Sequence, residues 1–565
     1  MNGSVAPLSQ RRDLSPEART AALVAALRSP RCYGHPAESI EVLETHISYV
    51  VLAGAVAYKI KKPVTLPFLD FSSLSARLHF CDEELRLNRR TAPDIYLDVV
   101  PICGSVDEPR VGGSGEPIEH AVKMRRFSQG NRLDRMATMG SLDPTIVDQL
   151  AAQVAELHAG APKADRSSEY GLPDTVLRSA FDNFSEIQAL RERGSRAAIP
   201  AVLYAWTIDQ HHVLADTLAR RKAEGFVREG HGDLHLANIV LYEDRPVIFD
   251  CIEFSPALRW ADVMSDVAFL MMDLIAHGRP RLAWRFLNAY LERTGDYGGL
   301  AVLRLYLVYR AMVRAKVACI RAAQLLPGHP QELEAEEEFA SHIALAMRLI
   351  EPPKRGVVVM HGLSGSGKTT VSQALAESLG AVRIRSDVER KRSSGFDGLA
   401  RTGAAVGAGL YTSRITDRTY EELASLARGL LRDGFTAIVD ATFLARARRR
   451  RFEAIASAAH APFAIVDCVA PRKALERRIA TRMAIVNDAS EAGLAVLEHQ
   501  LETQEPLEDD EWMASIACDT TLEDCEDCVA AALERRLGRQ EKETAACSTS
   551  TSSTATPTAS ARFIS

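Results

Sequence analysis

The sequence lacks long uninterrupted hydrophobic runs and has no strong excess of charge of either sign. Each apolar run is interrupted by Arg, Lys or Asp before about 18 residues, so none has the length of a membrane-spanning helix. The formal net charge is only -6, which argues against a surface built as a whole for nucleic acid or anionic lipid. A local basic patch stays compatible with this composition.

A signal peptide and a dense cysteine framework are also missing. The stretch MNGSVAPLSQRRDLSPEART carries charges of both signs and no apolar core of signal-peptide length. The 10 cysteines are scattered along the chain, as is typical of reduced thiols in a reducing compartment. Cys518, Cys525 and Cys528 form one cluster with a CxxC, but no fourth zinc ligand lies at a recognisable spacing. We therefore expect a cytoplasmic protein with no membrane segment.

The length of 565 residues, of which 47% are hydrophobic, predicts two or three globular units. Within the first 350 residues, we expect two β-rich runs in 38–62 joined by a turn at Ala53 and Gly54, and then a helix over 73–90. A second pair of strands is expected in YLDVVPICG and EHAVKMRRF. Residues 141–228 and 261–350 are expected to be mostly helical. This order predicts an α+β domain with a small lobe at about 38–128 and a helical lobe at about 129–350.

A second domain is expected to begin after the proline-containing linker EPPKRG. VVVMHGLSGSGKTT reads as a buried strand, a glycine loop and a helix start, and TAIVDATF and FAIVDCVA read as further buried strands. The pattern predicts an α/β domain with a parallel sheet over 354–540. Residues 541–565 lack the apolar side chains that would offset the entropy of ordering, so a disordered tail is predicted there.

GLSGSGKT satisfies the phosphate-loop pattern GxxxxGK[ST] between a strand and a helix. Glycines let the backbone N–H groups approach a phosphate closely, and the helix N-terminus adds partial positive charge. Lys368 would neutralise the β- and γ-phosphates and Thr369 would bind magnesium. The sequence thus predicts ATP and Mg²⁺ bound here, with nucleotide contacts from Gly362, Ser364, Gly365, Ser366, Gly367, Lys368, Thr369 and Thr370.

Two strand-end carboxylates follow this loop. Asp387 in RIRSD is the expected base that takes the acceptor proton, and Asp440 at the end of TAIVD is the expected carboxylate that reaches magnesium through water. Each could instead only cap the helix that follows its strand. Arg478 and Arg482 lie four residues apart and so share one helical face. That face could bind the charge on the transferred phosphoryl group, or it could lie in solvent.

RARRRRF contributes five arginines, Arg446 and Arg448–Arg451, which could follow a nucleic-acid backbone. Only Phe443 and Phe452 accompany them, so a solvated helix face or a phosphate-binding lid is the preferred interpretation. The part of the chain from about 354 to 540 resembles the P-loop kinase superfamily that includes gluconate kinase, zeta toxin and the polynucleotide kinase fold. This resemblance implies a kinase fold without naming its substrate.

HGDLHLANIVLYEDRPVIFD carries a second set of residues suited to phosphoryl transfer. Asp233 would accept the hydroxyl proton, Asn238 would bind magnesium, and Asp250 at the end of PVIFD would be the second metal ligand. Upstream, Lys59 ends VAYK on an expected strand and Glu84 lies on the following helix, where the two could pair. Lys61 shares the face of Lys59 and could substitute for it, whereas AVK ending at Lys123 lies after the helix.

Residues 38–345 resemble the aminoglycoside phosphotransferase branch of the protein-kinase-like fold, including Asp266 after the metal-binding Asp. The whole chain is similar to bacterial two-domain proteins in which such a domain is fused to a P-loop small-molecule kinase. The resemblance implies a bilobal protein-kinase-like domain followed by an α/β P-loop domain. The sequence departs from the protein-kinase pattern in two places. No GxGxxG precedes Lys59, and Asp250 is followed by CIEF where that pattern has FG.

An expected helix carries Arg310, Arg314 and Arg321 on one face. If that face meets the cleft, the acceptor is anionic. The alternative is that the face lies in solvent. The leading hypothesis is a bifunctional kinase in which each domain moves the γ-phosphoryl of MgATP to a hydroxyl of a small molecule. The alternatives are an ATP-binding regulator whose first domain is a non-catalytic sensor, and a polynucleotide 5′-hydroxyl kinase. Nucleic acid is not the expected partner, and neither the acceptors nor the oligomeric state can be predicted.

Overall fold

A computed structural model of the chain describes residues 15–66, 69–193, 199–352, 354–399, 412–483 and 493–550. The chain forms two compact units. The first comprises Met1–Arg279 and Ala301–Ile350, and the second comprises Pro280–Leu300 and Glu351–Ser565. The second unit therefore includes a short segment that lies, in sequence, within the expected helical lobe.

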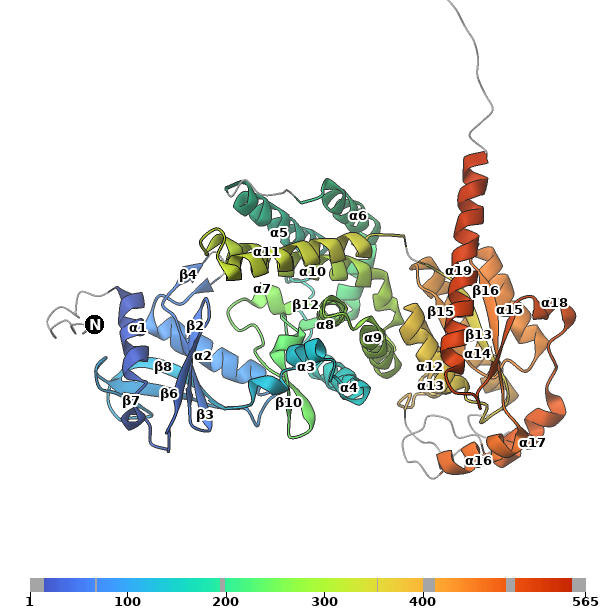
Figure 1. The fold of residues 1–565 in the computed structure, drawn as a ribbon, viewed down its shortest axis with the longest axis horizontal. Helices are drawn as coiled ribbons and strands as arrows, with labels where there is room; N and C mark the ends of the chain where they lie inside the picture. Colours follow the sequence, from blue (N-terminus) through green and yellow to red (C-terminus); the bar gives the residue numbers. More distant parts are fainter. Residues whose placement is uncertain are drawn as a thin grey trace, which may run out of the picture. The chain divides into compact units, whose positions relative to one another are not determined.

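An antiparallel sheet forms the small lobe of the first unit (Figure 1). Its strands, in spatial order, are β1 (Ile40–Glu44), β2 (Ser48–Ala53), β3 (Val56–Lys61), β8 (Pro117–Arg125), β6 (Tyr96–Gly104) and β7 (Pro109–Val111). The β-rich part within 38–62 makes three strands, because hydrogen bonds between Thr45 and Ser48 close an extra turn between β1 and β2. The expected turn at Gly54 is present at φ +61°, where a Cβ would lie 2.4 Å from the carbonyl oxygen of Pro36.

Helices cover both faces of this sheet. Leu23, Val24 and Leu27, in and just after α1 (Pro16–Ala26), pack with Val51 and Ile60 in one apolar cluster. The expected helix over 73–90 is α2 (Leu74–Asn88), which packs against β6 and β8 on a second cluster. This packing places Glu84, on the buried side of α2, under strand β3.

The helical lobe of the first unit surrounds one buried helix, α8 (Val263–Ala276). Every residue from Val263 to Leu274 of α8 is buried, including Asp266 and Asp273, so these carboxylates need partners inside the protein. The other main helices are α3 (Leu133–Met139), α4 (Pro144–Gly160), α5 (Pro173–Arg193), α6 (Ala201–Glu224), α10 (Leu300–Ala323) and α11 (Pro330–Leu349). The expected hairpin consists of β10 (Ile239–Tyr242) and β11 (Arg245–Ile248), and β9 (Val227–Glu229) pairs with β12 (Trp260–Asp262).

The second unit contains a parallel sheet of five strands, as the sequence predicts. The spatial order is β14 (Val382–Arg385), β15 (Ala437–Asp440), β13 (Val357–His361), β16 (Phe463–Val469) and β17 (Ser515–Asp519). All five residues of the central strand β13 are buried. Because side chains alternate between the two faces of a strand, both faces of the sheet are covered.

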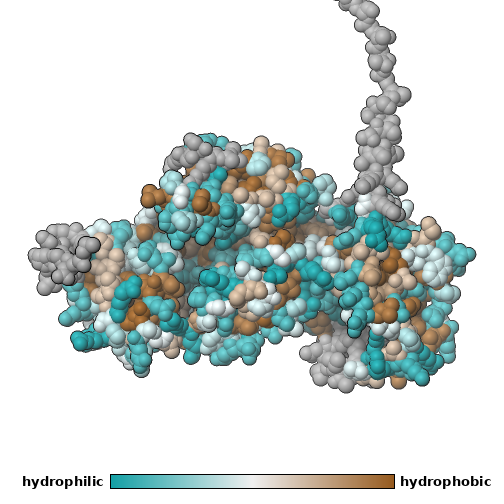
Figure 2. All heavy atoms as spheres, viewed as in Figure 1, coloured by the Kyte–Doolittle hydropathy of each residue, from teal (hydrophilic) through white to brown (hydrophobic). Residues whose placement is uncertain are grey.

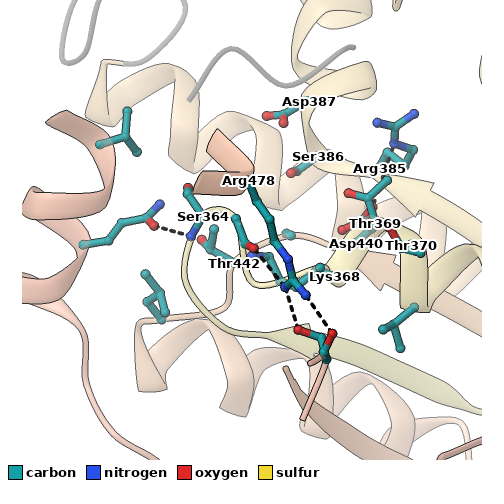
Figure 3. Close-up of a pocket in the computed structure, with 18 of the residues that line it drawn as sticks. Ser364, Lys368, Thr369, Thr370, Arg385, Ser386, Asp387, Asp440, Thr442 and Arg478 are labelled. Atoms are coloured by element: carbon teal, nitrogen blue, oxygen red, sulfur yellow. Dashed lines mark hydrogen bonds and ion pairs between the residues drawn. The ribbon is translucent and has the colours of Figure 1, made fainter. Parts of the chain in front are cut away.

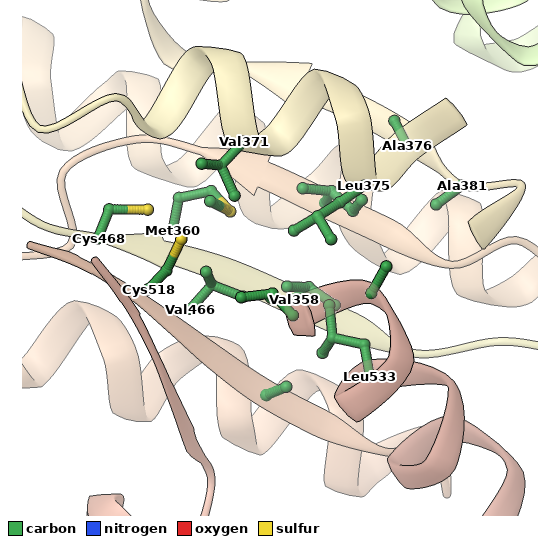
Figure 4. Packing of buried hydrophobic residues seen from close by; sticks show 14 residues of the cluster. Val358, Met360, Val371, Leu375, Ala376, Ala381, Val466, Cys468, Cys518 and Leu533 are labelled. Carbon is green, nitrogen blue, oxygen red and sulfur yellow. The ribbon is translucent and has the colours of Figure 1, made fainter. Parts of the chain in front are cut away.

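Figure 4 shows the core on one face of this sheet, where α12 (Lys368–Leu379) and α19 (Cys525–Ser550) meet the strands. Val358 and Val466 from the strands lie between Leu375 of α12 and Leu533 of α19 in this cluster. Burying such a side chain contributes about 1.5–3 kcal/mol relative to leaving it exposed. Helices α14 (Ser413–Arg432) and α15 (Arg446–Ala458) also pack against the sheet.

The last helix extends into the segment from 541 for which the sequence predicts disorder. α19 continues to Ser550. Once a helix is nucleated, it is extended one residue at a time through good helix formers such as Glu, Lys and Ala. The disordered tail expected at 541–565 stays a prediction. The rest of the expected tail, 551–565, lies outside the described residues.

Within the described ranges, no helix combines the length and the apolar character needed to cross a membrane. Figure 2 shows hydrophilic side chains over most of the visible face and apolar side chains in small patches. In the cysteine cluster, the Sγ atoms of Cys518 and Cys525 lie 3.4 Å apart, and both are free thiols. No group of three or more His, Cys, Asp or Glu side chains in the part of the chain that the structure describes is placed to hold a metal ion.

Candidate active sites

Two lysines of strand β3 share one buried glutamate in the first unit. Lys59 Nζ lies 2.8 Å from Glu84 Oε1 and 2.6 Å from Asp250 Oδ1. Lys61 lies 2.7 Å from the other oxygen of Glu84 and also contacts Glu253. Burial raises the pKa of Glu84, but the two ammonium groups outweigh it and hold this pKa at about 2. Glu84 is therefore ionised and fixes both lysines.

The geometry separates the roles of these lysines. Lys61 is 1% exposed and is enclosed by Glu84 and Glu253, whereas Lys59 is 13% exposed and is the lysine of the pair that contacts Asp250. Lys59 is thus the more exposed of the two lysines, and its preferred role as the phosphate-binding lysine stays a prediction. Lys123 lies on β8 opposite Tyr58.

Asp233 and Asn238 contact each other directly. Asn238 Nδ2 donates to the carbonyl oxygen of Asp233 at 3.0 Å and to its Oδ2 at 3.1 Å. With the amide nitrogen occupied in this way, the carboxamide oxygen of Asn238 is left to bind a metal. The N–H of Phe249 donates to the carbonyl oxygen of Asn238 at 3.0 Å, so Asn238 lies beside the residue that precedes Asp250.

Asp250 has φ +63°, a backbone conformation that is uncommon for residues other than glycine. Its side chain is 42% exposed and its Oδ1 accepts a hydrogen bond from Lys59. Strained conformations of this kind are concentrated at functional sites. Asn238 and Asp250 together fit a magnesium ion, which prefers a few protein oxygens supplemented by phosphate oxygens and water.

The charge state of Asp233 suits a residue that receives a proton. Burial raises the pKa of Asp233, but the imidazole of His235, at 3.3 Å from Oδ2, together with His231 and Arg314 outweighs burial and lowers this pKa below its ordinary value. Burial lowers the pKa of His231 itself. Asp233 is therefore a carboxylate across the physiological pH range.

Asp266 holds the backbone of the loop that carries Asp233. Its two carboxylate oxygens accept the N–H groups of His231 at 2.7 Å and Gly232 at 3.0 Å. At Gly230, a Cβ would lie 2.5 Å from Asp266 Oδ2, which explains the absence of a side chain there. Asp266 orients the loop and makes no contact with Asp233 itself that the structure records.

The three arginines on the face of α10 have different surroundings, and an anionic acceptor stays a prediction. Arg310 is buried, and its guanidinium donates to the carbonyl oxygen of Gly232 at 2.8 Å and to Ser265 Oγ at 3.2 Å. Arg314 lies 2.9 Å from Glu338, which also binds Arg321. Arg310 therefore braces the Asp233 loop, because a buried guanidinium must find oxygen partners wherever tertiary packing supplies them.

Replacing Asp266 by asparagine is expected to lower the free energy of unfolding by about 2 kcal/mol at pH 7. Burial raises the pKa of Asp266, but His158 and Arg310 outweigh it and hold this pKa at about 2, below the ordinary value of 3.8. A depressed pKa stabilises the folded state above the unfolded-state pKa, and this contribution is lost as the pH falls towards 2. Urea denaturation should show a difference in the free energy of unfolding between wild type and D266N that is fully present at pH 7 and becomes smaller below about pH 4. A difference that stays constant over this range would contradict the assignment.

A groove of about 570 Å³ in the first unit lies where the small lobe meets the segment after β8. Leu43, Leu52, Ala55 and Phe127 supply its apolar lining.

The neighbouring turn between β1 and β2, Thr45–Ile47, has no glycine. Lys62 Nζ holds this turn by donating to Glu44 and to the carbonyl oxygen of Thr45, both at 2.6 Å. Hydrogen bonds from Lys62 thus fix the conformation of this turn.

The phosphate loop of the second unit opens onto a cavity of about 1320 Å³ (Figure 3). Gly362 has φ +135°, and a Cβ there would lie 2.4 Å from the carbonyl oxygen of Cys468. Gly367 is in the left-handed region at φ +88° and caps α12, so the loop ends at a helix N-terminus. Lys368 Nζ donates to the carbonyl oxygen of Leu363 at 2.6 Å.

The structure brings most of the predicted residues of this unit to one cavity. Its lining includes Ser364, Gly365, Gly367, Lys368, Thr369, Thr370, Asp387, Asp440 and Arg478. Gly362 and Ser366 do not line it, and Ser366 is buried behind the loop. Arg482 lies on α16 (Arg472–Met483), but its side chain is outside the described residues.

The two expected carboxylates lie at the carboxyl ends of neighbouring strands. Asp387 is in the first turn of α13 (Ser386–Ser393), whose N-cap is Arg385, so Asp387 is not the cap. Arg390 lies 3.3 Å from Asp387. Asp440 ends β15, is buried, and with Thr369 fits a magnesium ion that also binds phosphate oxygens.

Arg478 makes contacts that the sequence did not indicate. Its guanidinium donates to the side-chain and carbonyl oxygens of Thr520 at 2.8 and 2.7 Å, and to the carbonyl oxygen of Gly365 at 3.4 Å (Figure 3). Arg478 thereby ties the phosphate loop to the segment after β17. A clamp role on the phosphoryl group remains a prediction for this residue.

Three further residues of the cavity were missed by the sequence analysis. Arg385 ends β14 directly before Ser386 and Asp387, so its position next to a candidate base was the available signal. Gln500 on α17 (Leu494–Thr503) accepts the N–H of Ser364 at 2.8 Å, and Thr520 binds Arg478. Nothing in the sequence near Gln500 or Thr520 connects them to the phosphate loop.

The arginine run at the start of α15 is largely occupied by acidic partners. Arg449 is fully buried and forms two hydrogen bonds to Glu511, at 2.7 and 2.9 Å. Arg446 and Arg450 both pair with Asp510. Arg448 lines the cavity, stacks over Tyr420 and lies 3.2 Å from Asp417. The interpretation as one solvated face is thus wrong for Arg449, because Glu511 offers it a buried partner.

Two family models match the chain. The model described as "Phosphotransferase enzyme family" matches residues 112–306, and the model described as "AAA domain" matches residues 357–507. The first match begins after β7, so Lys59 and Glu84 lie outside it. The two matches, the antiparallel small lobe and the parallel sheet confirm the fold class expected from the sequence.

The chain is 32% identical over 492 residues to Uncharacterized protein Rv2004c of Mycobacterium tuberculosis, in an alignment that covers 84% of this chain and 95% of the relative. Uncharacterized protein Mb2027c of Mycobacterium bovis gives the same values. Choline kinase from Cryptosporidium parvum is similar over 59% of this chain and 96% of its own, with 11% identity and a TM-score of 0.37. Gluconokinase from Sinorhizobium meliloti covers 35% of this chain and 99% of its own, with 20% identity and a TM-score of 0.23.

Proposed function

We propose that the chain, which belongs to the family of its mycobacterial relatives, is a bifunctional phosphotransferase. The proposal is supported by its own matches to a phosphotransferase family model and, further along, to an AAA-domain model. Each unit transfers the γ-phosphoryl group of MgATP to a hydroxyl of a small molecule. The observation that supports the proposal is that each unit brings together a carboxylate that could act as the base, oxygen groups that could bind magnesium, and a lysine that could bind phosphate.

In the first unit, Lys59 binds the phosphates and Glu84 keeps it in place. Asp233 lies at the acceptor hydroxyl. As the hydroxyl oxygen forms its bond to the γ-phosphorus, the bond from that phosphorus to ADP breaks and the hydroxyl proton passes to the carboxylate of Asp233. Magnesium held by Asn238 and Asp250 supplies charge neutralisation on the phosphates when bound.

In the second unit, the loop backbone and Lys368 bind the phosphates. Asp387, which lines the same cavity as the loop, takes the proton of the acceptor hydroxyl as that oxygen bonds to the γ-phosphorus and ADP leaves. Thr369 and Asp440 are the residues that would hold magnesium. The lining of the cavity includes the hydroxyl groups of Ser386, Ser413 and Thr416, which suit a hydroxylated molecule.

A broad screen of hydroxyl-bearing metabolites with the purified full-length chain and MgATP tests this function. We expect two classes of phosphorylated product, one lost in Asp233→Asn and the other lost in Lys368→Met. Products that survive both single substitutions, or that disappear together in either one, would contradict two independent activities.

One observation favours a second candidate function for the first unit, that of an ATP-binding sensor without turnover. The β1–β2 turn lacks the glycines that let a backbone close over the phosphates. On this hypothesis, Lys368→Met protein would still bind MgATP through Lys59 but would phosphorylate nothing in the screen. Any product that depends on Asp233 excludes it.

A further inference from the structure

Helix α9 (Pro280–Thr294) belongs to the P-loop unit, although it lies within the residues that match the phosphotransferase family model. It packs beside α12, which begins at Lys368, and against β14 (Figure 1). The contact is close: a Cβ at Gly380, the C-cap of α12, would lie 3.0 Å from the indole nitrogen of Trp284. A helix encoded outside the P-loop region is thus part of the P-loop fold.

The same helix completes the edge of the parallel sheet. β14 is the edge strand, and the buried side chain of Asn288 satisfies its open backbone groups. Asn288 Oδ1 accepts the N–H of Arg383 at 2.7 Å, and its Nδ2 donates to the carbonyl oxygen of Ala381 at 3.0 Å. These two hydrogen bonds fix the start of β14, the strand that ends at Arg385 just before Asp387.

One turn further along α9, Glu292 binds two alternate residues of β14. Its Oε1 accepts from Arg383 Nη2 at 2.6 Å and its Oε2 accepts from Arg385 Nη1 at 3.2 Å. Burial raises the pKa of Glu292, but the two guanidinium groups outweigh it and lower this pKa, so Glu292 is ionised. Arg383 also donates to the carbonyl oxygen of Thr369 at 3.1 Å, which links Glu292 to the end of the phosphate loop.

Arg385 projects from this pair into the cavity, on the same side as Asp440 and Thr369 (Figure 3). Its Nε lies 3.9 Å from Asp440 Oδ2, and its Nη1 is held by Glu292. Among the described residues, its Nη2 group has no hydrogen-bond partner that the structure records. Glu292 thus holds both guanidinium groups, and Asp440 and Asp387 in the cavity lining also stabilise the charge of Arg385. The Nη2 edge is the part of Arg385 that is left to donate to a group bound in the cavity.

We propose that Arg385 binds the transferred phosphoryl group in the second unit and that Glu292 on α9 is the positioning residue that holds Arg385 there. The inference rests on the function proposed for this unit. A planar guanidinium presents a rigid fork of donors, so the direction of its free edge depends on what holds the other edge. Without Glu292, the Nη1 edge of Arg385 loses its hydrogen-bond partner, so the direction of its other edge is no longer fixed.

The test compares the affinity of the full-length chain for MgADP alone and for MgADP with aluminium fluoride, which imitates the transferred phosphoryl group. Calorimetry is carried out in an Asp250→Asn background, which removes a metal ligand of the first unit. Because an enzyme binds analogues of its transition state more tightly, we expect aluminium fluoride to tighten binding by at least about 100-fold. Arg385→Met should abolish this tightening and Glu292→Gln should reduce it about tenfold or more, with the affinity for MgADP alone unchanged.

Glu377→Gln is the matched control, since Glu377 forms a 2.9 Å ion pair with Arg285 of α9 at the same interface but does not line the cavity. It should keep the full tightening. Equal tightening in all variants, or an equal loss in E292Q and E377Q, would overturn the inference and leave the proposed function standing. Unaltered MgADP affinity serves as the check on folding. If no binding of MgADP depends on Lys368, the proposed function of this unit fails, and the inference fails with it.

Discussion

Asp233→Asn is expected to reduce phosphoryl transfer by the first unit by about 10²- to 10⁴-fold, the usual range for loss of a general base. The substitution keeps the size and polarity of the side chain but removes the oxygen charge that receives the acceptor proton. His235 and Arg314 lower the pKa of Asp233, so the loss should be present at every pH above about 5. Rates are measured with the acceptor that the metabolite screen identifies and with MgATP in excess.

Asp244→Asn provides the matched control, because Asp244 is an exposed aspartate in the turn of the β10–β11 hairpin that follows Asp233 and has φ +58°, which asparagine tolerates. It should leave the rate unchanged. The affinity for MgATP should be similar in both variants and in wild type, since Asp233 meets the acceptor and not the nucleotide. A D233N variant that transfers phosphate at the wild-type rate would show that the base is a different residue.

Lys368→Met is expected to reduce transfer by the second unit by about 10²- to 10³-fold, in line with removal of one pre-organised donor from a phosphoryl-transfer site. The ammonium group neutralises the phosphates, and methionine keeps most of its length without the charge. Binding of MgATP to this unit should weaken as well. The activity that depends on Asp233 should be unaffected, because the two lysines, Lys59 and Lys368, belong to different units.

Lys473→Met controls for the loss of one lysine from the same unit, since Lys473 is exposed on α16 and does not line the cavity. It should retain the wild-type rate with the second acceptor. A K368M variant with full activity would mean that the phosphate loop of the second unit binds no nucleotide that is used in the reaction.

What could be predicted from the sequence is what depends on contiguous residues. Glycines, Lys368 and Thr369 lie within one loop, and the loop conformation itself requires their spacing. Asp233, Asn238 and Asp250 are likewise close in sequence, on one loop and one hairpin, so their proximity follows from local structure. The pairing of Lys59 with Glu84 follows from the order of strand and helix.

The remainder depends on tertiary partners that no local pattern shows. Glu292 meets Arg383 and Arg385 across 90 or more intervening positions, in a unit whose other residues come later in the chain. Arg449 looks like part of a solvated basic run, yet Glu511 lies where it can be buried as an ion pair. Whether an arginine lies in solvent or inside is decided by its partner, and helical periodicity does not identify that partner.

Calorimetric titration of the full-length chain with magnesium and a non-hydrolysable ATP analogue tests most directly whether two separate nucleotide sites exist. We predict two bound nucleotides per chain in wild type, one in Asp250→Asn, one in Lys368→Met, and none in the double variant. A single bound nucleotide in wild type that is lost in either single variant would contradict the account.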